Sequence, residues 1–167
     1  IRSSQVDFLE SDKLTRVKKL NAQFDYSKAL TRVDLQADSE DAGHVLGHVT
    51  LKNLEHLQAD FEVQKLPLVM LNPFTPEAYF NAGTAKVNAQ LQGDISQMQR
   101  NWMAFRGNLA FEGQDLDLQY APKGQERIQQ ALDRASIKIA WQNGNAKIDQ
   151  FELQENQSIF QIEGLAS

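Results

Sequence analysis

The chain of 167 residues contains no cysteine, and no apolar run in it approaches the length needed to cross a bilayer as a helix. The absence of cysteine excludes a disulfide framework, a thiolate metal site and a cysteine nucleophile. A basic leader with an apolar core is also missing, and the first residue is Ile1 rather than Met. We therefore expect a mature protein or an excised fragment of a longer one. If the parent protein has a membrane anchor, we expect it outside these residues.

An excess of positive charge is missing as well. The chain has 17 Lys and Arg against 22 Asp and Glu, which gives a net charge of -5. A nucleic-acid surface depends on clustered cations that meet phosphates, and a run such as Lys18-Lys19 is too short to provide one. We expect no nucleic-acid partner.

Motifs for catalysis or for a bound cofactor are absent from the sequence. It has no Gly-rich phosphate loop between a strand and a helix, and no recognisable Ser, His and Asp arrangement. His44, His48 and His56 are the candidate metal ligands, but on a strand His44 and His48 would lie roughly 13 Å apart, too far to share one ion. The carboxylates of Asp115 and Asp117 fall on the polar side of their segment. We expect no enzyme, no metal and no cofactor.

The main positive signal is an alternation of apolar and polar residues with a period of two. In Ala59–Gln64 every second residue is apolar, which is typical of a strand with one buried and one wet face. The same alternation recurs in the segments 20–26, 33–37, 45–51, 83–93, 105–113, 116–120, 137–141, 146–148, 151–153 and 160–164, with a further short strand at 6–8. The sequence predicts about ten strands in one domain that spans residues 1–167.

Turn residues separate several of these strands. Asp38–Gly43 predicts a turn by composition, Gly113–Asp115 a close turn between two strands, and Asn143-Gly144 a two-residue hairpin turn, because Asn and Gly accept positive φ. The segment 97–102 predicts a loop. Three of the four prolines lie in Leu66–Pro76, where the alternation breaks. Its apolar residues predict a short helical turn folded over one end or edge of the sheet.

Gln125–Ala135 is the segment with helical periodicity. Ile128, Ala131, Leu132 and Ala135 stand at i, i+3, i+4 and i+7, which gives one apolar stripe. We expect an amphipathic helix that rests on the apolar side of the sheet as a lid, with Ile128 and Leu132 as its contacts.

The predicted fold class is mainly β: a long curled antiparallel sheet or open barrel with one short amphipathic helix. Ten strands with one apolar face each need a partner layer, so the sheet either closes on itself or keeps its face open to a ligand as a groove. The residues expected to line this groove are Phe61, Val63, Val87, Leu91, Leu109, Phe111, Leu118, Ile139 and Trp141. Consecutive strands leave a free edge at each end of the sheet, which predicts edge-to-edge self-association.

A family resemblance adds to this reading. It rests on the run Leu54–Leu68, then Leu71-Asn72-Pro73-Phe74, then a strand that opens at Gly83 and closes at Leu91-Gln92-Gly93-Asp94, then Gly107-Asn108-Leu109 and Gln114–Leu118. These segments resemble the repeating segments of the AsmA-like superfamily, and within it the TamB family with its conserved DUF490 part. The resemblance covers residues 51–120.

The resemblance implies a trough of the β-taco kind with a hydrophobic inner surface, in a protein anchored in the inner membrane of a Gram-negative bacterium and spanning the periplasm. Such a protein would shield or conduct phospholipid or unfolded outer-membrane protein clients between the two membranes. It would act in protein translocation and outer-membrane biogenesis, with a TamA-like outer-membrane barrel protein as its partner. The alternative is a protein-binding scaffold subunit of an envelope machine, similar to the N component of type II secretion, which would use its strand edges and polar face.

Overall fold

The computed structural model describes residues 2–3, 6–10, 13–39, 43–75, 78–98, 105–120 and 128–166. Its elements are β1 (Arg2–Ser3), β2 (Val6–Glu10), β3 (Lys13–Tyr26), β4 (Leu30–Ser39), β5 (Gly43–Lys52), β6 (His56–Pro67), the 3-10 helix η1 (Leu68–Phe74), β7 (Ala78–Asp94), α1 (Ile95–Met98), β8 (Arg106–Tyr120), β9 (Ile128–Gln142), β10 (Asn145–Glu155) and β11 (Ser158–Ala166). Among these residues no helix is long and apolar enough to cross a membrane.

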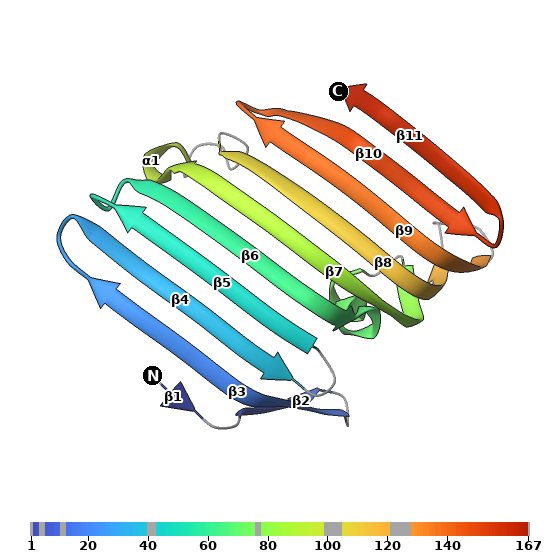
Figure 1. Cartoon of the computed structure of the whole chain (residues 1–167), viewed down its shortest axis with the longest axis horizontal. Coiled ribbons are helices and arrows are strands. Elements are labelled where there is room, and N and C mark those ends of the chain that lie inside the picture. Colours follow the sequence, from blue (N-terminus) through green and yellow to red (C-terminus); the bar gives the residue numbers. More distant parts are fainter. Residues whose placement is uncertain are drawn as a thin grey trace.

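The strands form one 11-stranded antiparallel sheet in which, from β2 onward, neighbours in the chain are neighbours in space (Figure 1). β1 and β2 both pair with β3 at one end, and β11 is the edge strand at the other. The sheet does not close into a barrel. The predicted class, a curled and open antiparallel sheet, is therefore confirmed.

Two of the predicted connections are observed. Asn143 and Gly144 have φ of 53° and 81° and form the two-residue turn between β9 and β10. The proline-rich segment forms η1, the expected helical turn. Ser39 ends β4 and Gly43 begins β5, so the turn expected at Asp38–Gly43 falls largely on 40–42, outside the described residues. The loop expected at 97–102 begins within α1, and the rest of it also lies outside them.

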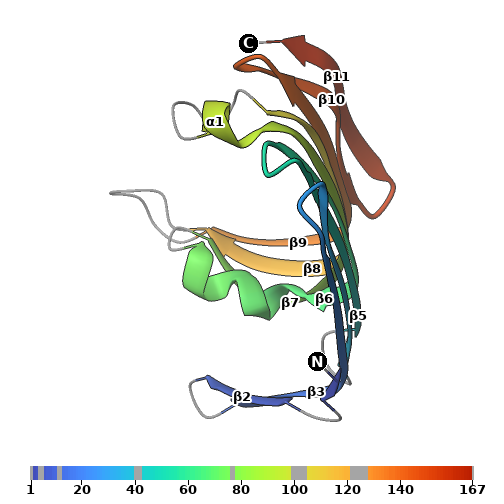
Figure 2. The same cartoon turned by 90° about the vertical axis from the view of Figure 1, so that its left-hand side faces the viewer.

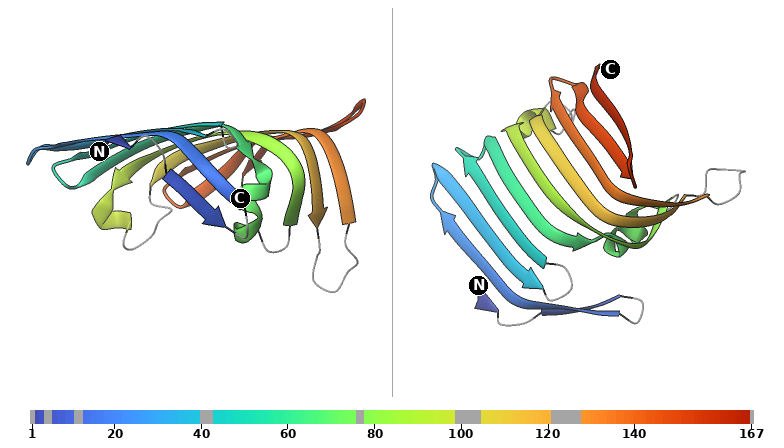
Figure 3. Two further views of the ribbon diagram at one scale, coloured as in Figure 1. Left: turned by 90° about the horizontal axis from the view of Figure 1, so that it is seen from below. Right: turned by 45° about the vertical axis from the view of Figure 1, so that its right-hand side comes forward.

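The sheet is a curved layer, with η1 and α1 both on its hollow side (Figure 2). Part of the curvature is a bend across three neighbouring strands, where Lys65 of β6, Gly83 of β7 and Asp115 of β8 have φ of 57°, 118° and 51°. The pairing register of β6 with β7 shifts at this bend, as expected for β-bulges, which kink a strand and increase its twist. Beyond the bend, the ends of β7, β8 and β9 curl out of the plane of the sheet (Figure 3).

The bend explains why the turn predicted at Gly113–Asp115 is wrong. β8 runs without interruption from Arg106 to Tyr120, and the Gly, Gln and Asp residues lie at its kink. Residues that tolerate positive φ suit a bulge as well as a turn. The local composition was therefore compatible with both.

The helix predicted at Gln125–Ala135 is also wrong. Residues 125–127 lie outside the described residues, and from Ile128 onward the chain is β9, paired with β8 along its length. Leu132 and Ala135 both pack against the same apolar cluster although they are three positions apart in the chain, because the alternation of sides changes phase at the bend. Ile128 and Leu132 share a side through even spacing on a strand. The spacing that predicted a helix is therefore the spacing of a bent strand. The helical lid expected to carry Ile128 and Leu132 does not form, because both residues belong to β9.

The small core lies where η1 meets the bend. Leu68, at 0% exposure, packs with Ala85 of β7 and Leu116 of β8. The partly buried residues around them are Leu71, Phe80, Val87, Phe111, Leu132 and Ala135. Since η1 contacts this side of the strands, the hollow side of the sheet is its apolar side.

Candidate functional site: an open apolar trough

Strand pairing aligns the apolar residues into three continuous rungs on the hollow side of the sheet. The first rung is Leu20–Ala37–Val45–Val63–Val87–Phe111–Ile137–Phe151–Ile162. The second is Ala22–Leu35–Gly47–Phe61–Ala89–Leu109–Ile139–Ile148, and the third is Phe24–Val33–Val49–Ala59–Leu91–Gly107–Trp141–Ala146. We call the surface formed by these rungs the trough face. No charged residue stands in any of them.

The trough face contains eight of the nine residues expected to line a groove. Phe61, Val63, Val87, Leu91, Leu109, Phe111, Ile139 and Trp141 occupy the three rungs. Leu118 lies beyond the bend, opposite Phe80 on β7 and Gln130 on β9. Of these residues Phe61 is 44% exposed, and the others are half-buried.

Sequence reasoning missed the outer parts of the trough face. Phe24 of β3 and Tyr26, two residues further on, stack with ring centroids 6.5 Å apart, and each is 64% exposed. At the other end, Phe151 and Phe160 meet edge to face at 6.3 Å. The alternation of apolar and polar residues in β3, β10 and β11 already places these aromatic residues on the apolar side of their strands. What the sequence did not reveal is that all the strands join one sheet and so present one surface.

No second layer covers the trough face within the described part of the chain. The buried apolar side chains there are Ala59, Leu68, Ala85, Phe105 and Leu116, of which two are alanines. A filled sandwich or barrel of this length would bury far more large side chains, because two apolar faces pack directly on each other. The trough face is therefore a broad apolar surface that remains accessible over most of its strands.

The opposite face is polar and carries all three histidines. Each histidine meets, through Nδ1, an aspartate on a neighbouring strand: His44 with Asp38, His48 with Asp34, and His56 with Asp94. Among the described residues no group of three potential ligands could hold a metal ion.

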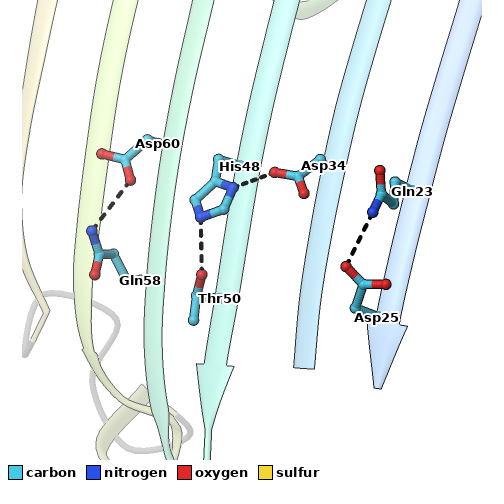
Figure 4. Close-up of polar contacts among 7 residues, drawn as sticks. All are labelled: Gln23, Asp25, Asp34, His48, Thr50, Gln58 and Asp60. Atoms are coloured by element: carbon cyan, nitrogen blue, oxygen red, sulfur yellow. Dashed lines mark hydrogen bonds and ion pairs between the residues drawn. The ribbon is translucent and has the colours of Figure 1, made fainter. Parts of the chain in front are cut away.

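His48 also contacts the hydroxyl of Thr50 through Nε2 at 3.0 Å, beside the amide and carboxylate side chains of the flanking strands (Figure 4). A hollow of about 710 Å³ on this side is lined mainly by amides and carboxylates, among them Asn21, Gln23, Asp34, Asp60 and Gln90. Two pairs of its lining side chains bond to each other across neighbouring strands, His48 with Asp34 and Asn108 with Gln90. The Thr50 hydroxyl lies beside the His48 imidazole, whose other ring nitrogen meets Asp34, but Thr50 is buried, at 7% exposure.

The fold and the trough face together define a single-layer, open antiparallel sheet with one apolar and one polar surface. Comparisons of the chain with protein-family models, with curated proteins and with solved structures found no match.

Proposed function

We propose that this chain is a periplasmic segment of an inner-membrane-anchored protein of the AsmA-like kind. Its trough face shields or conducts lipid, or unfolded outer-membrane protein clients, between the inner and outer membranes. An outer-membrane barrel protein similar to TamA would be its partner at the far side. The proposal assigns the chain a role in transport and no catalysis.

The observation that carries this proposal is the uncovered apolar trough face. Apolar surface that faces water is unfavourable by about 25 cal/mol per Å², and contiguous exposed patches of this kind usually mark an interaction surface. An acyl chain or an apolar peptide segment would relieve the cost by lying across the rungs. The lack of charged groups in the rungs favours such an occupant, because none of them would need to be desolvated.

The test is a carboxylate placed on the trough face away from the core. Leu109 is suitable because it lies in the second rung, whereas Val87 packs against the cluster around Leu68. We expect Leu109→Asp to weaken binding of a pyrene-labelled phospholipid by about tenfold or more, because the carboxylate must be desolvated. Circular dichroism should still report the native strand content.

Ala110→Asp is the matched control. Ala110 follows on the same strand, points to the polar face, and stands opposite Lys138. This variant should bind the labelled phospholipid as the unmodified chain does. If Leu109→Asp unfolds the domain as a substitution in a filled core would, or binds as well as the control, the trough face is not a binding surface.

A protein-binding scaffold in an envelope machine is the second candidate function, and the polar face with its hollow of amides and carboxylates favours it. Solvent extraction of the chain purified from native membranes, followed by mass spectrometry, separates the two. Recovery of phospholipid supports a transport function of the trough face. Repeated recovery of none, with protein partners retained, supports the scaffold.

A further inference from the structure

The polar face contains a hollow of about 710 Å³ that the proposed transport function does not use. It lies across two neighbouring rows of cross-strand partners. The first row is Gln23–Asp34–His48–Asp60–Gln90–Asn108, part of which is drawn in Figure 4, and the second is Asn21–Gln36–Leu46–Glu62–Asn88. Each of these residues lines the hollow, which we call the polar hollow.

We infer that the polar hollow binds a neutral oligosaccharide, whose hydroxyl groups bond the amide side chains and whose sugar rings pack on Leu46. The volume of the hollow is within the range of small-ligand sites. Its first row runs from β3 to β8, which at about 4.8 Å between strands gives a length of roughly 24 Å, enough for several sugar units. The inference does not depend on what the trough face binds.

Several polar side chains of the hollow have hydrogen-bonding groups to spare. Asn21, Gln36 and Asn88 make no side-chain hydrogen bond to any described residue. The carboxylate of Asp60 has only a long contact of 3.4 Å from Gln58 Nε2 among the described residues. A primary amide offers two donors and an acceptor, and a carboxylate offers acceptors only. Together these groups match the hydroxyls of a sugar, each of which both donates and accepts.

The charges of the hollow favour a neutral ligand. No Lys or Arg is among the described residues that line it, so the phosphate or sulfate of an anionic ligand would meet no cation there. Two of the carboxylates are already matched by the chain itself. Asp34 meets His48, and Glu62 accepts a hydrogen bond from Gln64 at 2.7 Å and has the Lys86 ammonium at 3.7 Å. The hollow therefore has little need of a cationic ligand.

Leu46 provides an apolar surface inside this polar setting. It stands between Gln36 and Glu62 in the second row and is 38% exposed. A single exposed leucine is ordinary on a protein surface. A sugar ring, however, has hydroxyls at its edge and C–H groups on its face, so a leucine surrounded by amides matches both of its surfaces.

NMR titrations of the ¹⁵N-labelled chain with two neutral oligosaccharides, maltohexaose and chitohexaose, test the inference. We expect at least one of them to give saturable shifts, with a dissociation constant on the order of 1 mM. The shifts should appear in the side-chain amide signals of Asn88 and Gln90 and in the backbone amide signal of Leu46. The side-chain signals of Gln150, which stands opposite Lys138 on the same face but outside the hollow, should not move.

Two substitutions in the hollow and one outside it show where the sugar binds. Asn88→Ala removes a hydrogen-bonding partner and should raise the dissociation constant about 2- to 10-fold. Leu46→Ser removes the apolar surface and should also raise it. Gln150→Ala is the matched control and should leave it unchanged. Leu109→Asp on the trough face should leave it unchanged as well, which separates this inference from the transport function. Circular dichroism checks that every variant keeps the native strand content.

Saturable shifts that weaken in Asn88→Ala and Leu46→Ser but not in Gln150→Ala support the inference. Absence of shifts with both oligosaccharides at tens of millimolar overturns it. Shifts that the two hollow variants leave unchanged also overturn it, because the sugar would then bind elsewhere. A parallel titration with hexalysine tests a cationic peptide as the occupant. If hexalysine moves the signals of the hollow and the neutral oligosaccharides do not, the carboxylates bind cations and the inference is wrong.

Discussion

The indole of Trp141 on β9 lies over Gly107 on β8, and a Cβ built at Gly107 would come within 2.2 Å of Trp141 Cζ2. Phe105 lies over Gly93 in the same manner, with a built Cβ at 2.0 Å from its ring. Glycine is needed at these positions for the close approach of a ring. On a sheet without a second layer, an aromatic ring that covers its neighbouring strand replaces part of the missing packing.

Gly107→Ala should lower the free energy of unfolding by about 1–3 kcal/mol, because the added methyl group must displace the indole. Urea denaturation followed by circular dichroism measures the change. Trp141→Val removes the obstacle, so adding Gly107→Ala to that variant should cost much less than it does in the unmodified chain. If the losses in free energy of unfolding from the two single substitutions simply add in the double variant, the two residues do not interact in this way.

Leu68 is the residue through which η1 attaches to the sheet. We expect Leu68→Ala to lower the free energy of unfolding by about 2–5 kcal/mol, because it removes a large side chain at 0% exposure and leaves a cavity between Ala85 and Leu116. Met70→Ala is the control on the same helix, at a position 36% exposed, and should cost less than about 1 kcal/mol. Equal costs for the two variants in urea denaturation would contradict this role of Leu68.

Asn72 of η1 acts as a strand partner for Phe80 of β7. Its Nδ2 donates to the Phe80 carbonyl at 3.0 Å, and its Oδ1 accepts the Phe80 N–H at 2.7 Å. Asn72→Ala leaves both backbone groups without this partner and should cost about 1–3 kcal/mol. Hydrogen exchange at the Phe80 amide should become much faster in that variant.

Asn72→Asp is the control for this contact. It keeps the acceptor and loses the donor, so the Phe80 amide should stay protected while the stability falls by an intermediate amount. Exchange at this amide that is the same in all three proteins would show that the side chain does not hold the strand.

The alternation in the sequence determined that the chain is built from strands and which side chains share a face. In β6 and β8 the groove residues Phe61, Val63, Leu109 and Phe111 could be named without a structure, because a period of two leaves no choice of side within one strand. The two-residue turn at Asn143-Gly144 was equally clear, since its dihedrals suit few other residues. The absence of a catalytic motif in the sequence favours a function carried by the apolar surface.

Tertiary structure decided how the strands are used. The spacing of Leu132 and Ala135 is compatible with one side of a helix, and also with a strand whose alternation changes phase at a bend. Only the pairing of β9 with β8 shows that this segment is a strand. Gly113–Asp115 likewise suits a turn or a bulge, and continuous pairing across Asp115 selects the bulge. Whether the apolar faces would close on each other or form one open surface depended on curvature summed over all the strands. The curvature of the sheet depends on contacts between residues far apart in the chain, so only the assembled sheet determines it.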